Sequence, residues 1–160
     1  MNNPKPALDR IDFRILQALQ NDARLSSAEL AERVALSPSP CWRRVKRLEE
    51  DGVIRGYHAK VDEKQLGFHL KAFVHVSLDK KDHAHVRLFE DAVRANPQIL
   101  ACYCVSGRYD HQLVVVARTM EEFGDFVRLQ VGALPNVKEV YTAFVLKEVK
   151  APTEALPDFS

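Results

Sequence analysis

The sequence predicts an α+β protein with two small domains, and two patterns support this fold class. In the first sixty residues the apolar side chains recur three and four positions apart, as on the buried face of a helix. From residue 69 onward, short apolar runs typical of strands alternate with helical patterns in the order βαββαβ. A length of 160 residues is enough for two such domains. We therefore predict a helical domain over 1–61 and a sheet domain over 62–160.

The composition is that of an ordinary globular protein. Hydrophobic residues make up 46% and charged residues 28% of the chain, which excludes disordered and fibrous classes. No apolar run reaches the ~20 residues that cross a bilayer, and the N-terminus lacks the apolar core of a signal peptide. The three cysteines form no CxxC pair and fit a reducing compartment. We expect a cytoplasmic protein with no membrane partner.

Two helices are expected before residue 36. Apolar residues recur at helical spacing from Leu8 to Leu19, and Asp9 is a plausible N-cap. Ser26 and Glu29 have the spacing of a capping box, which predicts the start of the second helix.

A third helix is expected in the segment LSPSPCWRRVKRLEEDGVIRGYHA, residues 36–59. Ser37 is a suitable N-cap, and Pro38 fits the first turn, where its missing N–H costs little. Gly52 suits the left-handed position that ends a helix. The break before this helix is short, so the second and third helices should form a helix-turn-helix. The apolar face of the third helix carries Cys41, Val45 and Leu48.

The outer face of the third helix is basic. From Arg33 to Arg47 the chain carries five Lys or Arg residues, both ends included, and no acid. Residues 1–60 carry a net charge of +3 against −2 for the remainder. Such a helix can lie in the phosphate-lined major groove of DNA, whereas the simpler interpretation is a helical bundle with a solvated basic face. The residues expected to contact double-stranded DNA are Ser37, Ser39, Trp42, Arg43, Arg44, Lys46 and Arg47.

The segment after the third helix is too short and too interrupted by glycine for another helix. We predict a strand over Val53–Val61 that serves as a wing and as the connector between domains, followed by a loop over Gln65–Phe68. Arg55 would add a phosphate contact from this wing, and Arg44 another from the edge of the third helix. Trp42 either contacts the sugar–phosphate backbone or covers the adjacent helix.

The second domain is expected to have the ferredoxin-like βαββαβ arrangement. Its strands are apolar on both faces, as where Phe73 adjoins Val74. Because two helices can cover only one face of a sheet, the other face should pack against a second subunit in a dimer. The predicted strands cover 70–78, 99–106, 109–118 and 137–149, and the predicted helices cover 83–95 and 119–131.

Four segments, in this order and at these spacings, resemble the Lrp/AsnC family of bacterial and archaeal regulators: LDRIDFRILQALQNDAR, LSPSPCWRRVKRLEEDGVIRGYHA, VSGRYD and FVLKEVK. The resemblance covers nearly the whole chain, from Leu8 to Lys150. It implies a sequence-specific transcriptional regulator with an N-terminal winged helix-turn-helix domain and a C-terminal domain that dimerises across its sheets. Such dimers often assemble into tetramers or octamers. Many members respond to an amino acid, which implies a role in amino-acid metabolism.

In this family the amino-acid effector binds in a cleft formed largely by a G-x-x-D-Y loop. Gly107 and Asp110 match that pattern, while His111 stands where the family usually has tyrosine. Gly107 lets backbone N–H groups approach a carboxylate, and Asp110 can accept hydrogen bonds from an ammonium group. His111 adds a group that titrates near neutrality. The alternative is that the segment is simply a turn. The residues that the resemblance assigns to the effector are Ser106, Gly107, Arg108, Tyr109, Asp110 and His111.

Three other interpretations remain open. Cys102 and Cys104 point to one side of a strand, but only the distant His75 or His111 could complete a zinc site, so thiols that pack the sheet explain them better and no metal is predicted. No Gly-rich phosphate loop or Gx-Ser-xG motif is present, so no catalytic residue is predicted. Some sirohaem decarboxylases share the two-domain architecture, but they have no need of a cationic third helix. An effector-free protein that bends DNA would differ only at 105–111.

Overall fold

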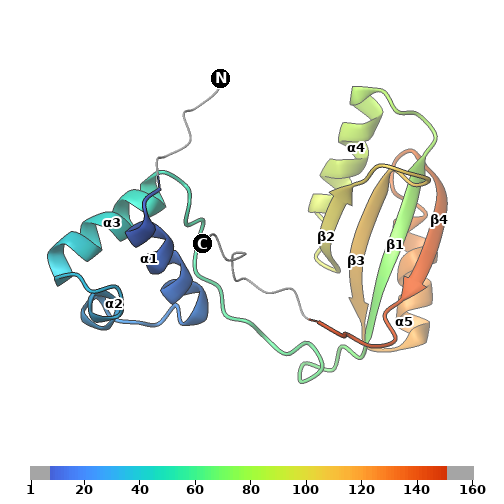
Figure 1. Cartoon of the computed structure of the whole chain (residues 1–160). Helices are drawn as coiled ribbons and strands as arrows, with labels where there is room; N and C mark the ends of the chain where they lie inside the picture. Colours follow the sequence, from blue (N-terminus) through green and yellow to red (C-terminus); the bar gives the residue numbers. More distant parts are fainter. Residues whose placement is uncertain (1–7, 151–160) are drawn as a thin grey trace. The chain divides into compact units, whose positions relative to one another are not determined.

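The computed structural model describes residues 8–150, which form two compact units that meet in the chain at Lys60 and Val61. The first unit is helical and the second contains a sheet with its helices (Figure 1). None of the helices within 8–150 is both long and apolar enough to span a bilayer.

The first unit consists of α1 (Arg10–Asn21), α2 (Ser27–Arg33) and α3 (Pro38–Glu50). The expected caps of the first two helices are confirmed. Asp9 and Ser26 each accept a hydrogen bond from the backbone of the first turn, and both capping boxes are complete. The core that joins the three helices is formed by Ile15, Leu16, Leu30, Ala31, Val34, Cys41 and Leu48.

The turn between α2 and α3 is tight, as a helix-turn-helix requires. Ala35 adopts a left-handed φ of +56°, and the N–H of Leu36 donates to the carbonyl of Ala31 at 2.9 Å. Ser37 occupies the N-cap position of α3, but its side chain makes no capping hydrogen bond. Gly52 follows α3 with a φ of +70°, as its predicted role at the helix end demands.

The wing strand predicted over Val53–Val61 is wrong: these residues form no strand. Val53 and Ile54 instead pack against the helical core, and the N–H of Ile54 donates to the carbonyl of Leu48 at 3.0 Å. The described residues of this unit contain no strand at all. An extended segment there therefore has no partner strand with which to form backbone hydrogen bonds. The loop predicted next is a hydrogen-bonded turn, in which the N–H of Phe68 donates to the carbonyl of Glu63.

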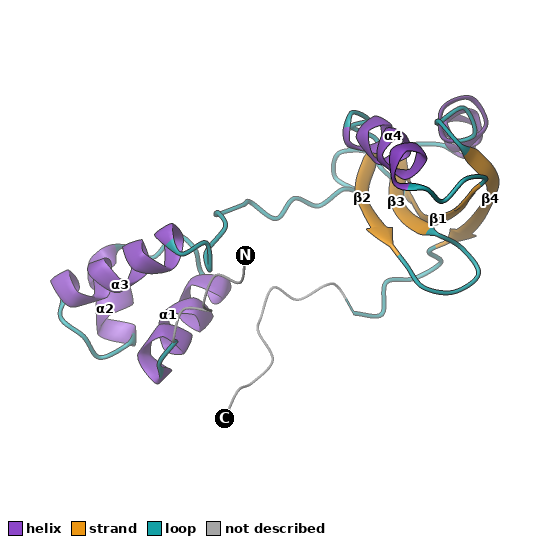
Figure 2. Ribbon diagram, turned by 90° about the horizontal axis from the view of Figure 1, so that it is seen from above, coloured by secondary structure: helices purple, strands orange, loops and turns teal. Residues whose placement is uncertain are grey.

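The second unit confirms the predicted βαββαβ order. It contains β1 (Leu70–Leu78), α4 (His83–Arg94), β2 (Ile99–Cys104), β3 (His111–Ala117), α5 (Met120–Asp125), a π-helical continuation η1 (Phe126–Val131) and β4 (Val137–Phe144). The four strands form one antiparallel sheet in the order β2-β3-β1-β4. Seen end-on, the helices lie on one side of the sheet only (Figure 2).

Alternation along the strands sorts the side chains of the sheet onto two faces. Ala72, Val74 and Val76 of β1 are fully buried beneath the helices, together with Phe89, Leu113 and Phe126. Their neighbours in β1 point to the opposite side, which no helix of this unit covers. We call this side the open sheet face. Paired positions place on it Phe73, His75, Ala101, Tyr103, Gln112, Val114, Tyr141 and Ala143.

Candidate DNA-binding and effector sites

The solvent-facing side of α3 carries the residues predicted to contact DNA. Burial of Cys41 and Leu48 fixes the rotation of the helix, so the polar side points outward. Lys46 places its ammonium 5.1 Å from the centre of the Trp42 ring. Neither Arg43 nor Lys46 forms an ion pair with any described residue. The exposed members of the predicted set are Ser37, Ser39, Trp42, Arg43, Lys46 and Arg47.

Two of the predicted arginines are engaged by acids at the start of α1. Arg44 donates from Nη1 to Oδ2 of Asp9 at 2.7 Å and to Oδ1 of Asp12 at 2.8 Å. Arg47 donates from Nη2 to Oδ2 of Asp12 at 2.5 Å. These bonds hold both guanidinium groups against α1, and only 28% of the Arg44 side chain is exposed.

Asp12 is the residue of this cluster that sequence reasoning missed. Its side chain is fully buried, and it also accepts a hydrogen bond from the N–H of Asp9. A buried carboxylate needs such partners because desolvation of an unpaired charge is costly. The N–H of Asp12 and then the Arg44 guanidinium hold the pKa of Asp9 below its usual value. The sequence did contain a signal for this role. Asp12 is an acid within the apolar face of α1, so its charge requires a partner from another element.

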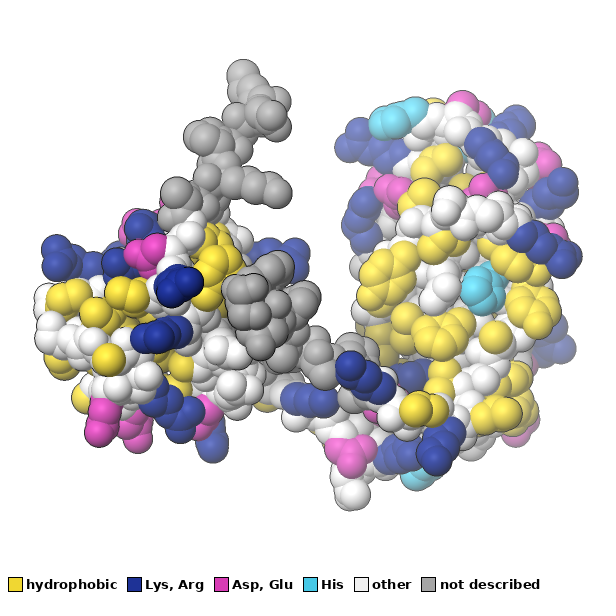
Figure 3. Space-filling view, in the orientation of Figure 1, with side chains coloured by type: hydrophobic (Ala, Val, Ile, Leu, Met, Phe, Trp, Pro, Cys, Tyr) yellow, Lys and Arg dark blue, Asp and Glu magenta, His cyan; other side chains and the backbone are white. Residues whose placement is uncertain are grey.

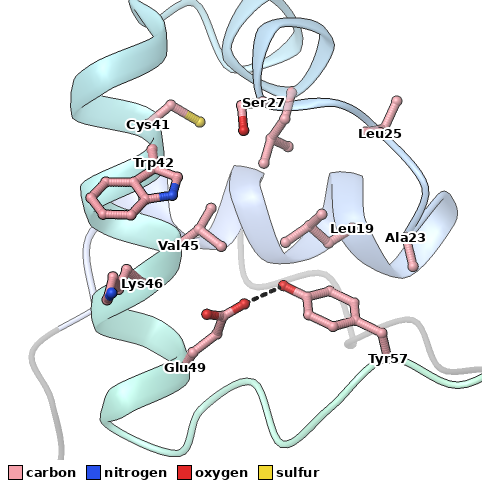
Figure 4. A pocket seen from close by; sticks show the side chains of 11 residues that line it. Leu19, Ala23, Leu25, Ser27, Cys41, Trp42, Val45, Lys46, Glu49 and Tyr57 are labelled. Atoms are coloured by element: carbon pink, nitrogen blue, oxygen red, sulfur yellow. Dashed lines mark hydrogen bonds between the residues drawn. The ribbon is translucent and has the colours of Figure 1, made fainter.

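A pocket of about 350 Å³ lies beside α3 within the first unit (Figure 4). Leu19 and Val45 form part of its apolar wall, while Trp42 and Lys46 line it from the outer side of α3. Tyr57 closes one side, and its hydroxyl donates to Oε1 of Glu49 at 2.8 Å. Burial, with the nearby Glu49, raises the pKa of Tyr57 to about 12. The start of the connector is thereby attached to α3.

In the second unit, the predicted effector loop between β2 and β3 is a closed turn. The N–H of Val105 donates to the carbonyl of Asp110 at 2.9 Å, and Gly107 takes a φ of +127°, which favours glycine. Arg108 is exposed, with its guanidinium carbon 5.2 Å from the centre of the Tyr109 ring. Ser106 and Gly107 are exposed as well, so the tip of the loop is open to solvent.

Asp110 is held by three contacts with the end of β1 and the residues that follow it. Its N–H donates to the carbonyl of Val76 at 3.0 Å, and its Oδ2 accepts from the N–H of Leu78 at 2.9 Å. Its Oδ1 accepts from Nζ of Lys81 at 2.7 Å. Burial alone would raise the pKa of Asp110, but the hydrogen bonds from Lys81 and the Leu78 N–H outweigh it and hold this pKa low. The carboxylate is therefore ionised near neutrality.

His111 lies apart from the exposed tip of the loop. Only 2% of its surface is exposed, and its ring packs 4.8 Å from that of Phe89. Its ring nitrogens form no hydrogen bond with a described residue, and Nε2 lies 3.8 Å from Oε1 of Glu90. Cys102, Cys104 and Glu90 line the same pocket of about 300 Å³. No group of three or more His, Cys, Asp or Glu side chains within 8–150 is arranged to hold a metal ion.

Tyr109 connects the loop with the open sheet face. Its ring stacks on that of Tyr141 with centres 5.8 Å apart, and His75 lies 5.3 Å from it. Figure 3 shows hydrophobic side chains gathered over this face around a histidine. Phe73 and Tyr141 remain exposed there, so a large apolar area has no cover from the described residues of this unit.

Comparison with known proteins assigns both units. A family model described as winged helix-turn-helix DNA-binding matches residues 8–55, and one described as the Lrp/AsnC ligand binding domain matches residues 71–155. Together they define a DNA-binding regulator that carries a ligand-binding domain. The chain belongs to the Lrp/AsnC family of transcriptional regulators, as the resemblance implied.

Relatives and solved structures agree with this assignment. The chain is 40% identical to the Bkd operon transcriptional regulator of Pseudomonas aeruginosa, over 89% of this chain and 93% of the relative. It is 42% identical to the leucine-responsive regulatory protein of Rhizobium meliloti, over 89% and 92%. A transcriptional regulator of Neisseria meningitidis solved with L-methionine superposes with a TM-score of 0.88 at 40% identity, covering 94% of this chain and 96% of that one.

Proposed function

We propose that the chain regulates transcription by binding a pseudo-palindromic DNA site through α3. The observation that carries this proposal is the pair Arg43 and Lys46, exposed on the outer face of α3 and not neutralised by any described acid. Cations without an internal carboxylate partner are available to phosphates and base edges, whereas Arg44 already has two carboxylate partners. Arg43 and Lys46 are therefore assigned the principal contacts, with Ser37, Ser39, Trp42 and Arg47 beside them.

Selection from a random pool of double-stranded DNA, followed by mobility-shift titration, tests this proposal. Arg43→Ala and Lys46→Ala should each weaken binding to the selected duplex by about tenfold or more, because a good base-edge contact contributes ~1–3 kcal/mol. Arg87→Ala, at an exposed arginine of α4, is the matched control and should bind as the wild type does. Unchanged affinity in both α3 variants would contradict the assignment.

The effector is proposed to be an amino acid bound at the loop over Ser106–Asp110. The exposed tip around Gly107 and the ionised carboxylate of Asp110 support this proposal. The regulator of Neisseria meningitidis solved with L-methionine and the leucine-responsive relatives make methionine and leucine the first candidates. A thermal-shift screen of the twenty amino acids tests it, since a ligand that binds only the folded state raises the melting temperature. If none shifts it, the effector-free architectural interpretation gains.

The open sheet face is proposed to bury itself against a second copy of the chain. A dimer would place two copies of α3 for two half-sites, and further assembly to tetramers or octamers is proposed on the family resemblance. Because the chain would act on DNA, its proposed location is the bacterial cytoplasm.

A further inference from the structure

Two loops at one end of the sheet are joined by an ion pair whose purpose the fold does not explain. Lys81 comes just after β1, and Asp110 ends the loop that follows β2. Their charged atoms lie 2.7 Å apart, although 67% of the Lys81 side chain is exposed. An exposed pair of this kind contributes little to stability, because holding the long lysine side chain in place costs entropy.

The backbone that carries Lys81 is fixed, so only the side chain is free to move. Asn136 accepts the N–H of Lys80 on Oδ1 at 2.8 Å and donates from Nδ2 to the carbonyl of Lys80. The N–H of Asp79 donates to the backbone carbonyl of Asn136 at 2.9 Å. The segment before Lys81 is thus anchored, while the side chain can swing from Asp110 without disturbing it.

Asp110 keeps one oxygen fixed and one exchangeable. Oδ2 is committed to the Leu78 N–H within the protein, whereas Oδ1 binds only the ammonium group of Lys81 among the described residues. The carboxylate side chain retains 22% exposure, so another ammonium group can approach Oδ1 from solvent.

We propose that Lys81 is the residue that recognises the carboxylate of the effector. In the absence of effector, its ammonium group occupies the position on Asp110 Oδ1 that the effector's ammonium group takes on binding. This inference rests on the proposed amino-acid response. On binding, the ligand's ammonium replaces Nζ of Lys81 on Asp110, and the ligand's carboxylate pairs with the released Lys81. One ion pair becomes two, with no charge left unpaired.

The same arrangement selects the class of ligand. A simple amine would displace Lys81 and leave it without a partner, and a simple carboxylate would have to break the Lys81–Asp110 pair without replacing it. A molecule that carries both groups on one carbon satisfies both residues. Free α-amino acids have this chemistry, whereas their amides and N-acylated derivatives do not.

Isothermal titration calorimetry on the full chain tests the role of Lys81. The probes are the twenty standard L-amino acids and, for each that binds, its carboxamide, used below neutrality where the amine is protonated. The wild type should prefer the acid over its amide by about tenfold or more, as expected for a charge-assisted hydrogen bond. In Lys81→Gln this preference should disappear, because the acid loses its carboxylate partner while the amide no longer has to displace Lys81 from Asp110. Lys81→Arg should retain it.

Lys80→Gln is the matched control, because it makes the same change of charge one residue earlier, where only the backbone contacts Asn136. It should keep the wild-type preference. If Lys81→Gln still prefers the acid over the amide as the wild type does, the role of Lys81 is overturned while the amino-acid response stands. If no amino acid binds the wild type, both are overturned. Equal weakening of acid and amide in Lys81→Gln would mark a structural role and also overturn the inference.

Discussion

Arg44 Nη1 lies 2.8 Å from Oδ1 of Asp12, a carboxylate with no solvent-exposed surface. The two residues are 32 positions apart, and their pair fixes α3 onto α1. Arg44 therefore positions α3 against α1, whereas its neighbour Arg43 has no ion-pair partner among the described residues.

Substitution of Arg44 should lower the stability of the first unit much more than substitution of the adjacent Arg43. Arg44→Ala removes one of the two cations on buried Asp12 and should lower the free energy of unfolding of the first unit by about 2–3 kcal/mol. Arg43→Ala, at an exposed position, should change it by less than about 0.5 kcal/mol. Urea unfolding followed by the fluorescence of Trp42, the single tryptophan, measures this unit directly. Equal effects of the two substitutions would show that the buried pair does not stabilise the unit.

Asp9 should make the first unit sensitive to acid. Its pKa in the folded chain is lowered by the N–H of Asp12 and then by Arg44, so its contribution is fully present above its unfolded pKa of about 4. That contribution is lost as the pH falls through the lower folded pKa. Asp9→Asn should therefore be less stable than the wild type near neutrality, and the difference should shrink as the pH falls below the unfolded pKa of the aspartate. Urea midpoints across this range test it; a constant difference would contradict it.

Salt dependence should distinguish phosphate contacts from internal ion pairs. Replacing Arg43 or Lys46 by Ala should reduce the slope of log K against log salt concentration by about 1 for each phosphate contact that is lost. Arg44→Met keeps much of the apolar stem and should leave the slope near that of the wild type. In the wild type the guanidinium of Arg44 is already paired with Asp9 and Asp12, so it adds no phosphate contact. A slope reduced as much in Arg44→Met as in Arg43→Ala would place Arg44 on the DNA after all.

The open sheet face should determine self-association. Tyr141→Asp introduces a charge at an exposed position of that face and should shift the protein toward monomers by at least tenfold in dissociation constant. Leu88→Asp makes a comparable change at an exposed apolar residue of α4, away from that face, and serves as the control. Sedimentation velocity measures both. Dimers of unchanged strength in Tyr141→Asp would exclude this face as the interface.

Replacement by alanine should have opposite effects on stability at Gly107 and Gly124. No atom lies within 4 Å of a Cβ placed on Gly107 or Gly124, so steric contact does not separate them. Gly107 has a φ of +127°, and alanine there should cost about 1–2 kcal/mol of backbone strain. Gly124 lies within α5 without a positive φ, and alanine there should stabilise by about 0.5–1 kcal/mol. Thermal unfolding of the two variants decides whether the backbone accounts for the difference.

Local signals explain which parts of the fold were predictable. The caps at Asp9 and Ser26 act within a single turn, and both form as the sequence indicates. The predicted strand over Val53–Val61 failed because a strand needs a partner, and extended character in the sequence does not supply one.

The sequence by itself determined the positions of the three helices of the first unit, the βαββαβ order of the second and the basic face of α3, because periodicity and capping depend on residues a few positions apart. Its four characteristic segments determined the family. Only the tertiary structure decided which charges are free. It paired Arg44 with Asp12 and Lys81 with Asp110, contacts between residues 32 and 29 positions apart. Such pairs form where the packing of helices and strands brings distant segments together, which local spacing does not record.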